Sequence, residues 1–301
     1  MIHLSVQLIV PVTLMLAMVS CWCLPRYLTG LFAGLSLGFG LAYGVIQVPA
    51  LPFIALLLAA AWWLSKVQPA FLKSLLPALL FFAVSVAFML HWVPGFHNPL
   101  IWEQQAVKPL SIPYTLYINS DKPWIALAVL LFLSGYGHLM EPKKPLHVSL
   151  LQTREQWHCA FLKSLLPIGL MLVLVFPIAM ASGFVRWQPG WPELTAWFLV
   201  NNLLLTSLTE EAFFRGFFQG MLSRYLPGNG VGVVVAIMVP ALIHGIGHYP
   251  GGALYVTLVI LCSAFYGWVY HRTGSLEMAV LSHWLLNASH FLLFSYPGIQ
   301  Y

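Results

Sequence analysis

Glu210, Glu211 and Arg215 lie close together within an otherwise apolar stretch of the sequence. On a helix, Glu211 and Arg215 would be spaced i and i+4, so their side chains could form an ion pair. Glu210 would point about 100° away from that pair and would lack its cation. A structural salt bridge at a helix end accounts for Glu211 and Arg215 but leaves Glu210 unexplained. Glu210 is therefore a candidate general base, the kind of group that activates a water molecule.

His244 and His248 follow in a second apolar stretch, again at i and i+4. Histidines with this spacing share one helix face and could ligate a metal ion. The zinc-protease pattern HExxH is not met, because Gly245 and not glutamate follows the first histidine. Packing histidines held by hydrogen bonds are the alternative interpretation.

His283 and Asn287 form a third pair with the same spacing, and His290 lies one further turn along. Hydrogen bonding between neighbouring helices would also explain such residues. Together with Glu210 and the earlier histidines, however, they could deprotonate a water and stabilise an oxyanion. The same groups could instead hold a divalent metal that binds the water. Either arrangement would hydrolyse an acyl bond.

The elements that carry these residues belong to a very apolar chain. It has 301 residues, of which 60% are hydrophobic and only 7% are charged, against about a quarter charged in soluble domains. Such a composition excludes a soluble globular enzyme and a disordered chain. The 13 basic residues are scattered, so the net charge of +5 does not indicate a nucleic-acid-binding surface. The four cysteines show no CxxC spacing, which argues against a disulfide framework.

The pattern predicts an all-α, polytopic transmembrane bundle of about ten helices. The predicted spans are 4–23, 28–47, 50–65, 71–93, 124–140, 161–183, 194–220, 231–248, 252–270 and 276–295. Basic residues favour cytoplasmic loops, and most fall there if the N-terminus lies outside the cytoplasm. This topology predicts that both termini lie outside.

The chain divides near residue 150. Residues 1–150 form an N-terminal transmembrane region, in which the long polar-aromatic loop 94–123 lies outside, and residues 151–301 carry the candidate site. A straight helix over 231–248 would be about 27 Å long and would place His248 far from Glu210. We therefore expect either a short or tilted helix, or a segment 248–252 that bends back and lines a cavity.

The order EExxxR, a closing histidine and HxxxN resembles the CPBP family of intramembrane proteases. The family includes type II CAAX prenyl endopeptidases and bacteriocin-processing or self-immunity proteins. The resemblance covers roughly residues 160–295 and includes the turn at 272–276. It implies an intramembrane protease core in an integral protein of a bacterial cytoplasmic membrane.

The resemblance also implies roles for the site residues. Glu210 would activate water with help from His248, Glu211 and Arg215 would be a supporting pair, and His283 and Asn287 would complete the site. Whether a metal takes part stays open: Glu210, His248 and His283 would be the ligands of a divalent ion such as zinc. His244, where the family usually has phenylalanine, would be an additional ligand or a packed ring.

The expected partners are the lipid bilayer and a peptide or protein segment that enters from the membrane, with no requirement that it be prenylated. Two other classes of function remain. One is a non-catalytic scaffold or immunity protein of the same fold. The other is a proton-coupled transporter, which the lack of paired broken helices in matching halves argues against.

Overall fold

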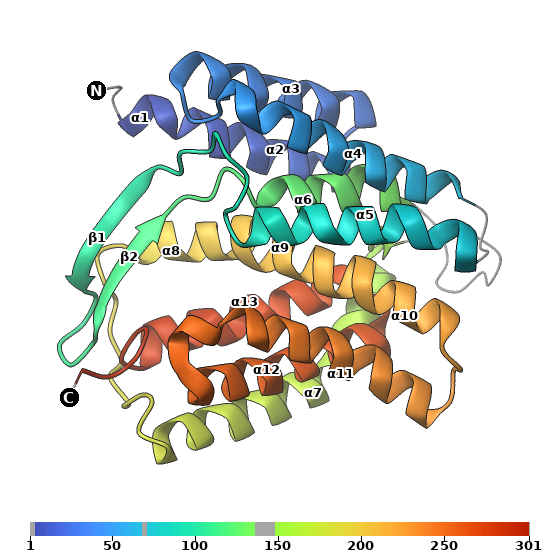
Figure 1. Ribbon diagram of the computed structural model, residues 1–301. Coiled ribbons are helices and arrows are strands. Elements are labelled where there is room, and N and C mark those ends of the chain that lie inside the picture. The colour runs from blue at the N-terminus through green and yellow to red at the C-terminus, as the bar shows by residue number, and fades with distance from the viewer. Residues whose placement is uncertain (1–3, 68–70, 136–147, 301) are drawn as a thin grey trace.

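The computed structural model describes residues 4–67, 71–135 and 148–300. Its helices lie roughly alongside one another in a bundle, with the N-terminal helices along one side and α7 along the other (Figure 1). The first helices are α1 (Leu4–Gln7), α2 (Ile9–Cys23), α3 (Arg26–Tyr43), η1 (Val48–Ala50), α4 (Leu51–Lys66) and α5 (Phe71–Met89).

A second set of helices carries the candidate residues. They are α6 (Pro123–Ala128) with η2 (Val129–Leu133), α7 (Arg154–Ala181), α8 (Thr195–Asn201), η3 (Asn202–Ser207), α9 (Leu208–Glu211), η4 (Ala212–Gln219), α10 (Gly220–Tyr225), α11 (Gly230–Gly247), η5 (Tyr249–Gly251), α12 (Gly252–Thr273) and α13 (Leu276–Leu293). With α1–α2 and α8–α10 each counted as one continuous rod, the described ranges contain ten helices. The all-α fold class is confirmed.

The predicted loop 94–123 contains a β-hairpin. Strands β1 (Leu100–Ala106) and β2 (Pro113–Tyr117) pair antiparallel, with Leu100 opposite Tyr117 and Ala106 opposite Pro113. A second pair, parallel and very short, joins β3 (Ser134–Gly135) to β4 (Val148–Ser149). The pairing of the two strands is interrupted by register shifts between Leu100 and Trp102 and between Trp102 and Gln105.

Five helical segments in the described part of the chain are long and apolar enough to cross a membrane. They are Val48–Lys66, Phe71–Met89, Arg154–Ala181, Gly230–Gly247 and Tyr249–Thr273. The remaining helices are shorter, less apolar or interrupted. This set supports an integral membrane protein.

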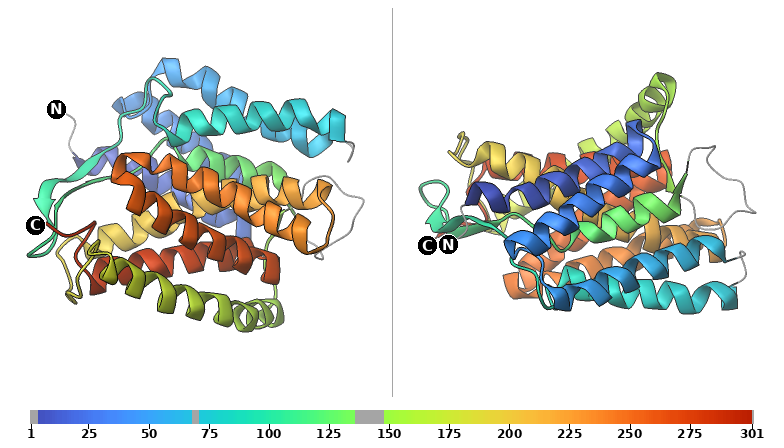
Figure 2. Two further views of the ribbon diagram at one scale, coloured as in Figure 1. Left: turned by 60° about the horizontal axis from the view of Figure 1, so that its bottom comes forward. Right: turned by 90° about the horizontal axis from the view of Figure 1, so that it is seen from above.

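Both termini and the β-hairpin lie at the same end of the bundle, as the two further views also show (Figure 2). The sequence-based topology places these three parts on one side of the membrane. Which side that is stays a prediction.

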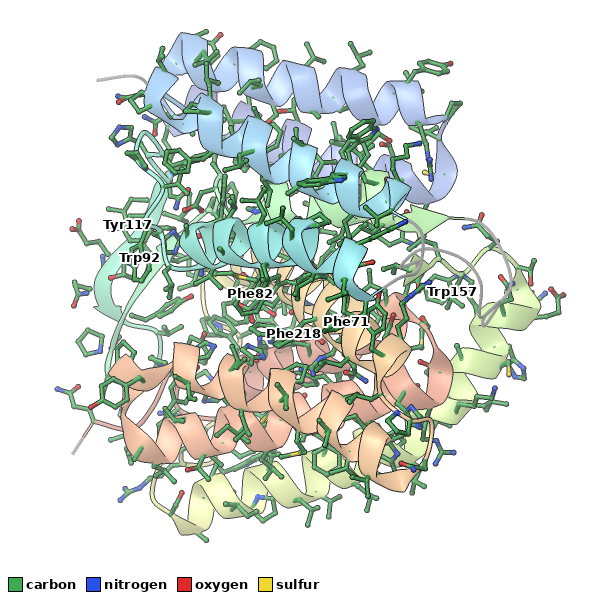
Figure 3. The ribbon with its side chains drawn as sticks, turned by 45° about the vertical axis from the view of Figure 1, so that its right-hand side comes forward. Phe71, Phe82, Trp92, Tyr117, Trp157 and Phe218 are labelled. Carbon is green, nitrogen blue, oxygen red and sulfur yellow. The ribbon has the colours of Figure 1, made fainter. Side chains whose placement is uncertain are left out.

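The largest hydrophobic core contains residues from both regions of the chain. Leu14, Phe81 and Ile125 of the N-terminal region lie in one cluster with Phe213 and Phe217. Phe82 of α5 also packs edge-on against Phe218 of η4, at 5.2 Å between ring centroids (Figure 3). The N-terminal helices therefore support the helix that carries the two glutamates.

Candidate active site

The two glutamates lie on a continuous helical rod from Thr195 to Tyr225. The predicted span 194–220 captures this rod but not its two π-helical segments, η3 and η4, which lie on either side of α9. Such widened turns are frequent at functional sites. Glu210 and Glu211 are both buried, on adjacent positions that face different neighbours.

Glu211 faces α13 and its own helix. Its Oε2 accepts a hydrogen bond from Arg215 Nε at 2.8 Å, and its Oε1 lies 2.8 Å from His283 Nδ1. Glu211 and Arg215 are fully buried, and the ring of Tyr266 stacks on His283 at 4.5 Å between centroids. The structure thus contains the ion pair expected from the i, i+4 spacing, and it shows a use of Glu211 that the spacing does not reveal.

Glu210 faces α11. Its Oε2 lies 3.1 Å from His244 Nε2 and 3.9 Å from His283 Nε2. The ring of His244 stacks on Phe214 at 4.3 Å between centroids, and its Nδ1 lies 3.0 Å from Ser263 Oγ. His244 is therefore held on three sides, and it is the closest of these histidines to the Glu210 carboxylate.

His248 follows the last residue of α11. Its ring centroid lies 5.3 Å from that of His244 and 5.4 Å from that of Tyr255. The helix is full length, so the expected short helix is not found. His248 still reaches the site because Glu210 lies about midway along its own rod, beside α11.

The segment after His248 is irregular, as expected. Residues Tyr249–Gly251 form a 3-10 turn, and Gly252 has a φ of 85°, a backbone conformation that favours glycine. Within 248–252, His248 is the residue that lines the central cavity. The turn thus follows His248 directly and leads into α12. We expected the whole segment 248–252 to line the cavity, but only the side chain of His248 does so.

Asn287 is held by a polar residue of the glutamate helix. Its Nδ2 donates to Asn202 Oδ1 at 3.3 Å, and Ser207 Oγ lies 3.2 Å from the same oxygen. His290, one turn further along α13, contacts the carbonyl oxygen of Ser295 at 3.2 Å. The α13 helix that positions these residues is capped at its N-terminus by Ser275, whose side chain accepts a hydrogen bond from Met278 N.

These side chains converge on one cavity of about 370 Å³ inside the bundle. It is lined by Glu210, His244, His248, His283 and Asn287 among others. Glu211 and Arg215 do not line it and lie behind its wall. Aromatic and aliphatic residues of α7, α12 and the hairpin also contribute to the lining, so the cavity offers both polar and apolar surface to a bound molecule.

At the hairpin end of the bundle, three segments are tied together by hydrogen bonds of one lysine. Lys108 donates from Nζ to the carbonyl oxygens of Gln188 at 3.1 Å and Phe294 at 2.6 Å. Burial lowers the pKa of Lys108 to about 8. Tyr114 of β2 and Tyr296 pack edge-on at 5.1 Å, and both line the cavity.

The donor set of a metal site is also present. One ligand atom each from Glu210, His244 and His248 lies within 4.8 Å of the others. His283 is not part of this group, although its Nε2 lies 3.9 Å from Glu210 Oε2. Among the described residues, the close cluster therefore includes His244 where the resemblance implies His283.

Sequence reasoning does not single out Ser263, Asn202 or Tyr266. Each contacts a candidate residue from a distant part of the chain. Serine is ordinary in membrane helices, so Ser263 gives no signal by itself. The adjacent pair Asn201 and Asn202, inside an apolar stretch, is a signal that could have been used.

One family of known proteins matches this part of the chain. Residues 191–289 match the family model described as Rce1-like, type II CAAX prenyl endopeptidase Rce1-like. The matched range contains Glu210, Glu211, Arg215, His244, His248, His283 and Asn287. Comparisons with curated proteins and with solved structures give no match. Residues 191–289 of this integral membrane protein are thus similar to the Rce1-like type II CAAX prenyl endopeptidases, a protease family consistent with the CPBP resemblance.

Proposed function

We propose that this protein is an intramembrane endopeptidase that hydrolyses a peptide bond of a membrane-associated substrate with a water activated by Glu210. The observation that supports this most is the convergence of Glu210, His244, His248, His283 and Asn287 on one buried cavity. Ionisable groups inside a membrane bundle are costly and usually functional. The protease family matched at residues 191–289 agrees with this reading.

In the proposed reaction, Glu210 takes a proton from the water as its oxygen attacks the scissile carbonyl carbon. The proton then passes to the leaving amine nitrogen as the C–N bond breaks. Asn287 uses one N–H on Asn202 and keeps a second that could donate to the developing oxyanion. His248 faces the same cavity and assists Glu210 with the water.

His283 is oriented by Glu211. A carboxylate only accepts hydrogen bonds, so the contact between Glu211 Oε1 and His283 Nδ1 places the proton on Nδ1. The other ring nitrogen, Nε2, is then unprotonated, faces Glu210 and is the nitrogen that can take part in the reaction. Arg215 holds the same carboxylate from its other oxygen.

A divalent metal such as zinc fits the residues present. Two imidazoles and one carboxylate make a usual catalytic zinc donor set, and Glu210, His244 and His248 would hold the ion. A bound metal would lower the pKa of its water and polarise the scissile carbonyl. His283 remains the further candidate ligand that the family resemblance implies.

The experiment is cleavage of fluorogenic peptides, prenylated and unprenylated, by the purified protein in lipid nanodiscs. Glu210→Gln and His283→Ala should each lower kcat/KM by about 10²-fold or more. Glu155→Gln, which changes an exposed glutamate of α7, should behave like the wild type. Cleavage that survives both site substitutions would exclude this catalytic assignment. A wild type that cleaves nothing in the panel would favour the scaffold or immunity function.

Removal of divalent metal tests the second part of the proposal. If a metal holds the water, a chelator should abolish cleavage and added zinc should restore it, with one ion bound per chain. If Glu210 acts without metal, the chelator should leave cleavage unchanged. The bound metal is measured by mass spectrometry on the same samples.

A further inference from the structure

Ser263 connects the buried Arg215 to His244, the histidine nearest to the Glu210 carboxylate. It lies fully buried on α12. Arg215 Nη2 donates to its Oγ, and the same Oγ lies 3.0 Å from His244 Nδ1. On the far side of the ring, His244 Nε2 lies 3.1 Å from Glu210 Oε2. One continuous path of contacts thus runs from Arg215 to Glu210.

The contacts along this path favour one assignment of the hydrogen-bonding protons to Arg215, Ser263 and His244. An arginine guanidinium only donates, so Ser263 Oγ must accept from Arg215 and keeps its own proton for another partner. An ionised carboxylate only accepts, so the ring nitrogen facing Glu210 must donate. A neutral imidazole carries one N–H, which is therefore on Nε2. Nδ1 is then bare and accepts the proton of Ser263.

The opposite tautomer fits these contacts poorly. A proton on Nδ1 would leave Nε2 bare against the oxygen of Glu210, with two acceptors facing each other at 3.1 Å. Both His244 and Ser263 are buried, so water does not readily relieve such a contact. The shape of the site also restricts the ring, because His244 stacks on Phe214.

We infer that Ser263 is a positioning residue that, in the metal-free site, holds His244 as the Nε2–H tautomer, so that His244 donates to Glu210 and orients that carboxylate in the cavity. The inference rests on the proposed function in one respect, since it assigns Glu210 as the group being oriented. The simpler alternative is that Ser263 serves only as a hydrogen-bond partner of Arg215.

The tautomer is measured directly by nitrogen-15 NMR of histidine-labelled protein after treatment with a chelator. His244→Phe, which keeps a ring of similar shape against Phe214, identifies the His244 signals by their loss. We expect a protonated Nε2 and an unprotonated, hydrogen-bonded Nδ1. Ser263→Ala should shift the Nδ1 signal, whereas Ser164→Ala, which removes a buried hydroxyl from α7, should not. A protonated Nδ1 in the wild type would overturn the inference.

A double-mutant cycle separates the two roles of Ser263. If Ser263 acts through His244, Ser263→Ala should lower kcat by about fivefold to tenfold with little change in KM, as for loss of one hydrogen bond. In the His244→Phe background the same substitution should change kcat by less than about twofold, since the ring nitrogen is gone. Equal losses in both backgrounds would show that Ser263 only supports Arg215.

The two measurements keep this inference distinct from the proposed function. The tautomer is read from the protein without substrate, so it can be established in a protein that cleaves nothing. Suppose that cleavage depends on Glu210 but that His244 is protonated on Nδ1. The endopeptidase proposal would then stand, and the proposed role of Ser263 would be excluded.

Discussion

At the scale of single residues, the interior of the bundle holds a buried ion pair between Glu211 and Arg215. Glu211 and Arg215 are fully buried and 2.8 Å apart, and His283 contacts the second oxygen of the same carboxylate. Taking both charges out of water is costly, and their mutual attraction compensates only while both are present. The pair therefore supports the cavity wall from behind.

Arg215→Met should destabilise the protein by about 3–5 kcal/mol, because the Glu211 carboxylate would remain buried without its cation. The measurement is the free energy of unfolding in detergent by denaturant titration. Arg272→Met, at an exposed position of α12, is the control and should cost less than about 1 kcal/mol. The double substitution Glu211→Gln with Arg215→Met should be less destabilised than Arg215→Met alone. A single variant as stable as the wild type would contradict this account.

Asp121, outside the membrane-spanning segments, gives a pH dependence. Burial alone would raise the pKa of Asp121, but hydrogen bonds from His91, the Lys122 N–H and Asn98 outweigh it and hold that pKa below its ordinary value. A lowered folded-state pKa contributes stability that is present above the unfolded-chain pKa of about 3.9 and is lost as the pH falls through the folded-state pKa.

Asp121→Asn should therefore flatten the fall in stability between about pH 4 and pH 2, measured as the unfolding temperature at each pH. Glu103→Gln, at an exposed position of β1, should keep the acid dependence of the wild type. An unchanged acid dependence in Asp121→Asn would show that this carboxylate is not responsible.

At the scale of elements, the approach of α11 to α12 places two histidines at the cavity. A Cβ added to Gly245 would lie 2.3 Å from a side-chain carbon of Ile260 and 3.0 Å from the carbonyl oxygen of Val256. Gly247, two residues later, has nothing within 4 Å of the same position. The sequence shows both glycines but not which of them the neighbouring helix requires.

Gly245→Ala should destabilise the protein by about 1–3 kcal/mol, because the added methyl group would push α11 away from α12. Gly247→Ala should be neutral or slightly stabilising, since alanine favours the helix. Thermal unfolding of the two variants side by side is the measurement. Equal stabilities would mean that α11 and α12 do not pack as closely as described.

The sequence predicts most of the elements and misses particular features of them. Apolar length places a helix over 194–220, and the structure has a rod from Thr195 to Tyr225. The π segments beside α9 are missed because they change the register of the helix without changing its composition. The capping box at Thr153 starts α7 earlier than the predicted 161, since hydropathy ignores capping side chains.

At the scale of the whole molecule, the N-terminal region and the region that carries the candidate site are joined by specific contacts. Trp22 of α2 donates to Glu277 Oε1 of α13 at 2.8 Å, and the same oxygen accepts from Leu151 N at 2.7 Å. Ser275 Oγ donates to the other oxygen of Glu277. A buried carboxylate with three donors thus ties α2 to the start of the helix that carries His283.

Trp22→Phe should destabilise the protein by about 1.5–3 kcal/mol, the usual cost of losing a hydrogen bond to a charged group. We expect one cooperative unfolding transition for both regions, shifted to lower denaturant concentration. Trp62→Phe, on a half-exposed face of α4, is the matched control and should shift the transition less. Separate transitions for the two regions would contradict the coupling described here.

The sequence by itself determines the compartment, the fold class and the residues of interest. A chain so apolar and so poor in charges is typical of a membrane bundle. Charged side chains inside membrane-spanning stretches are costly, so the few that occur there, Glu210, Glu211 and Arg215, stand out as functional candidates. Spacing along one helix also determines the pairing of Glu211 with Arg215, since neighbours at i and i+4 share a face.

The tertiary structure alone decides which residues meet across helices. It places His244 and not His283 nearest to Glu210, gives His283 to Glu211, and introduces Ser263 between Arg215 and His244. The physical reason is that periodicity fixes the direction of a side chain on its own helix. The partner of that side chain depends on how a second helix is rotated and how closely it packs. Small residues such as Gly245 and the π segments determine that packing.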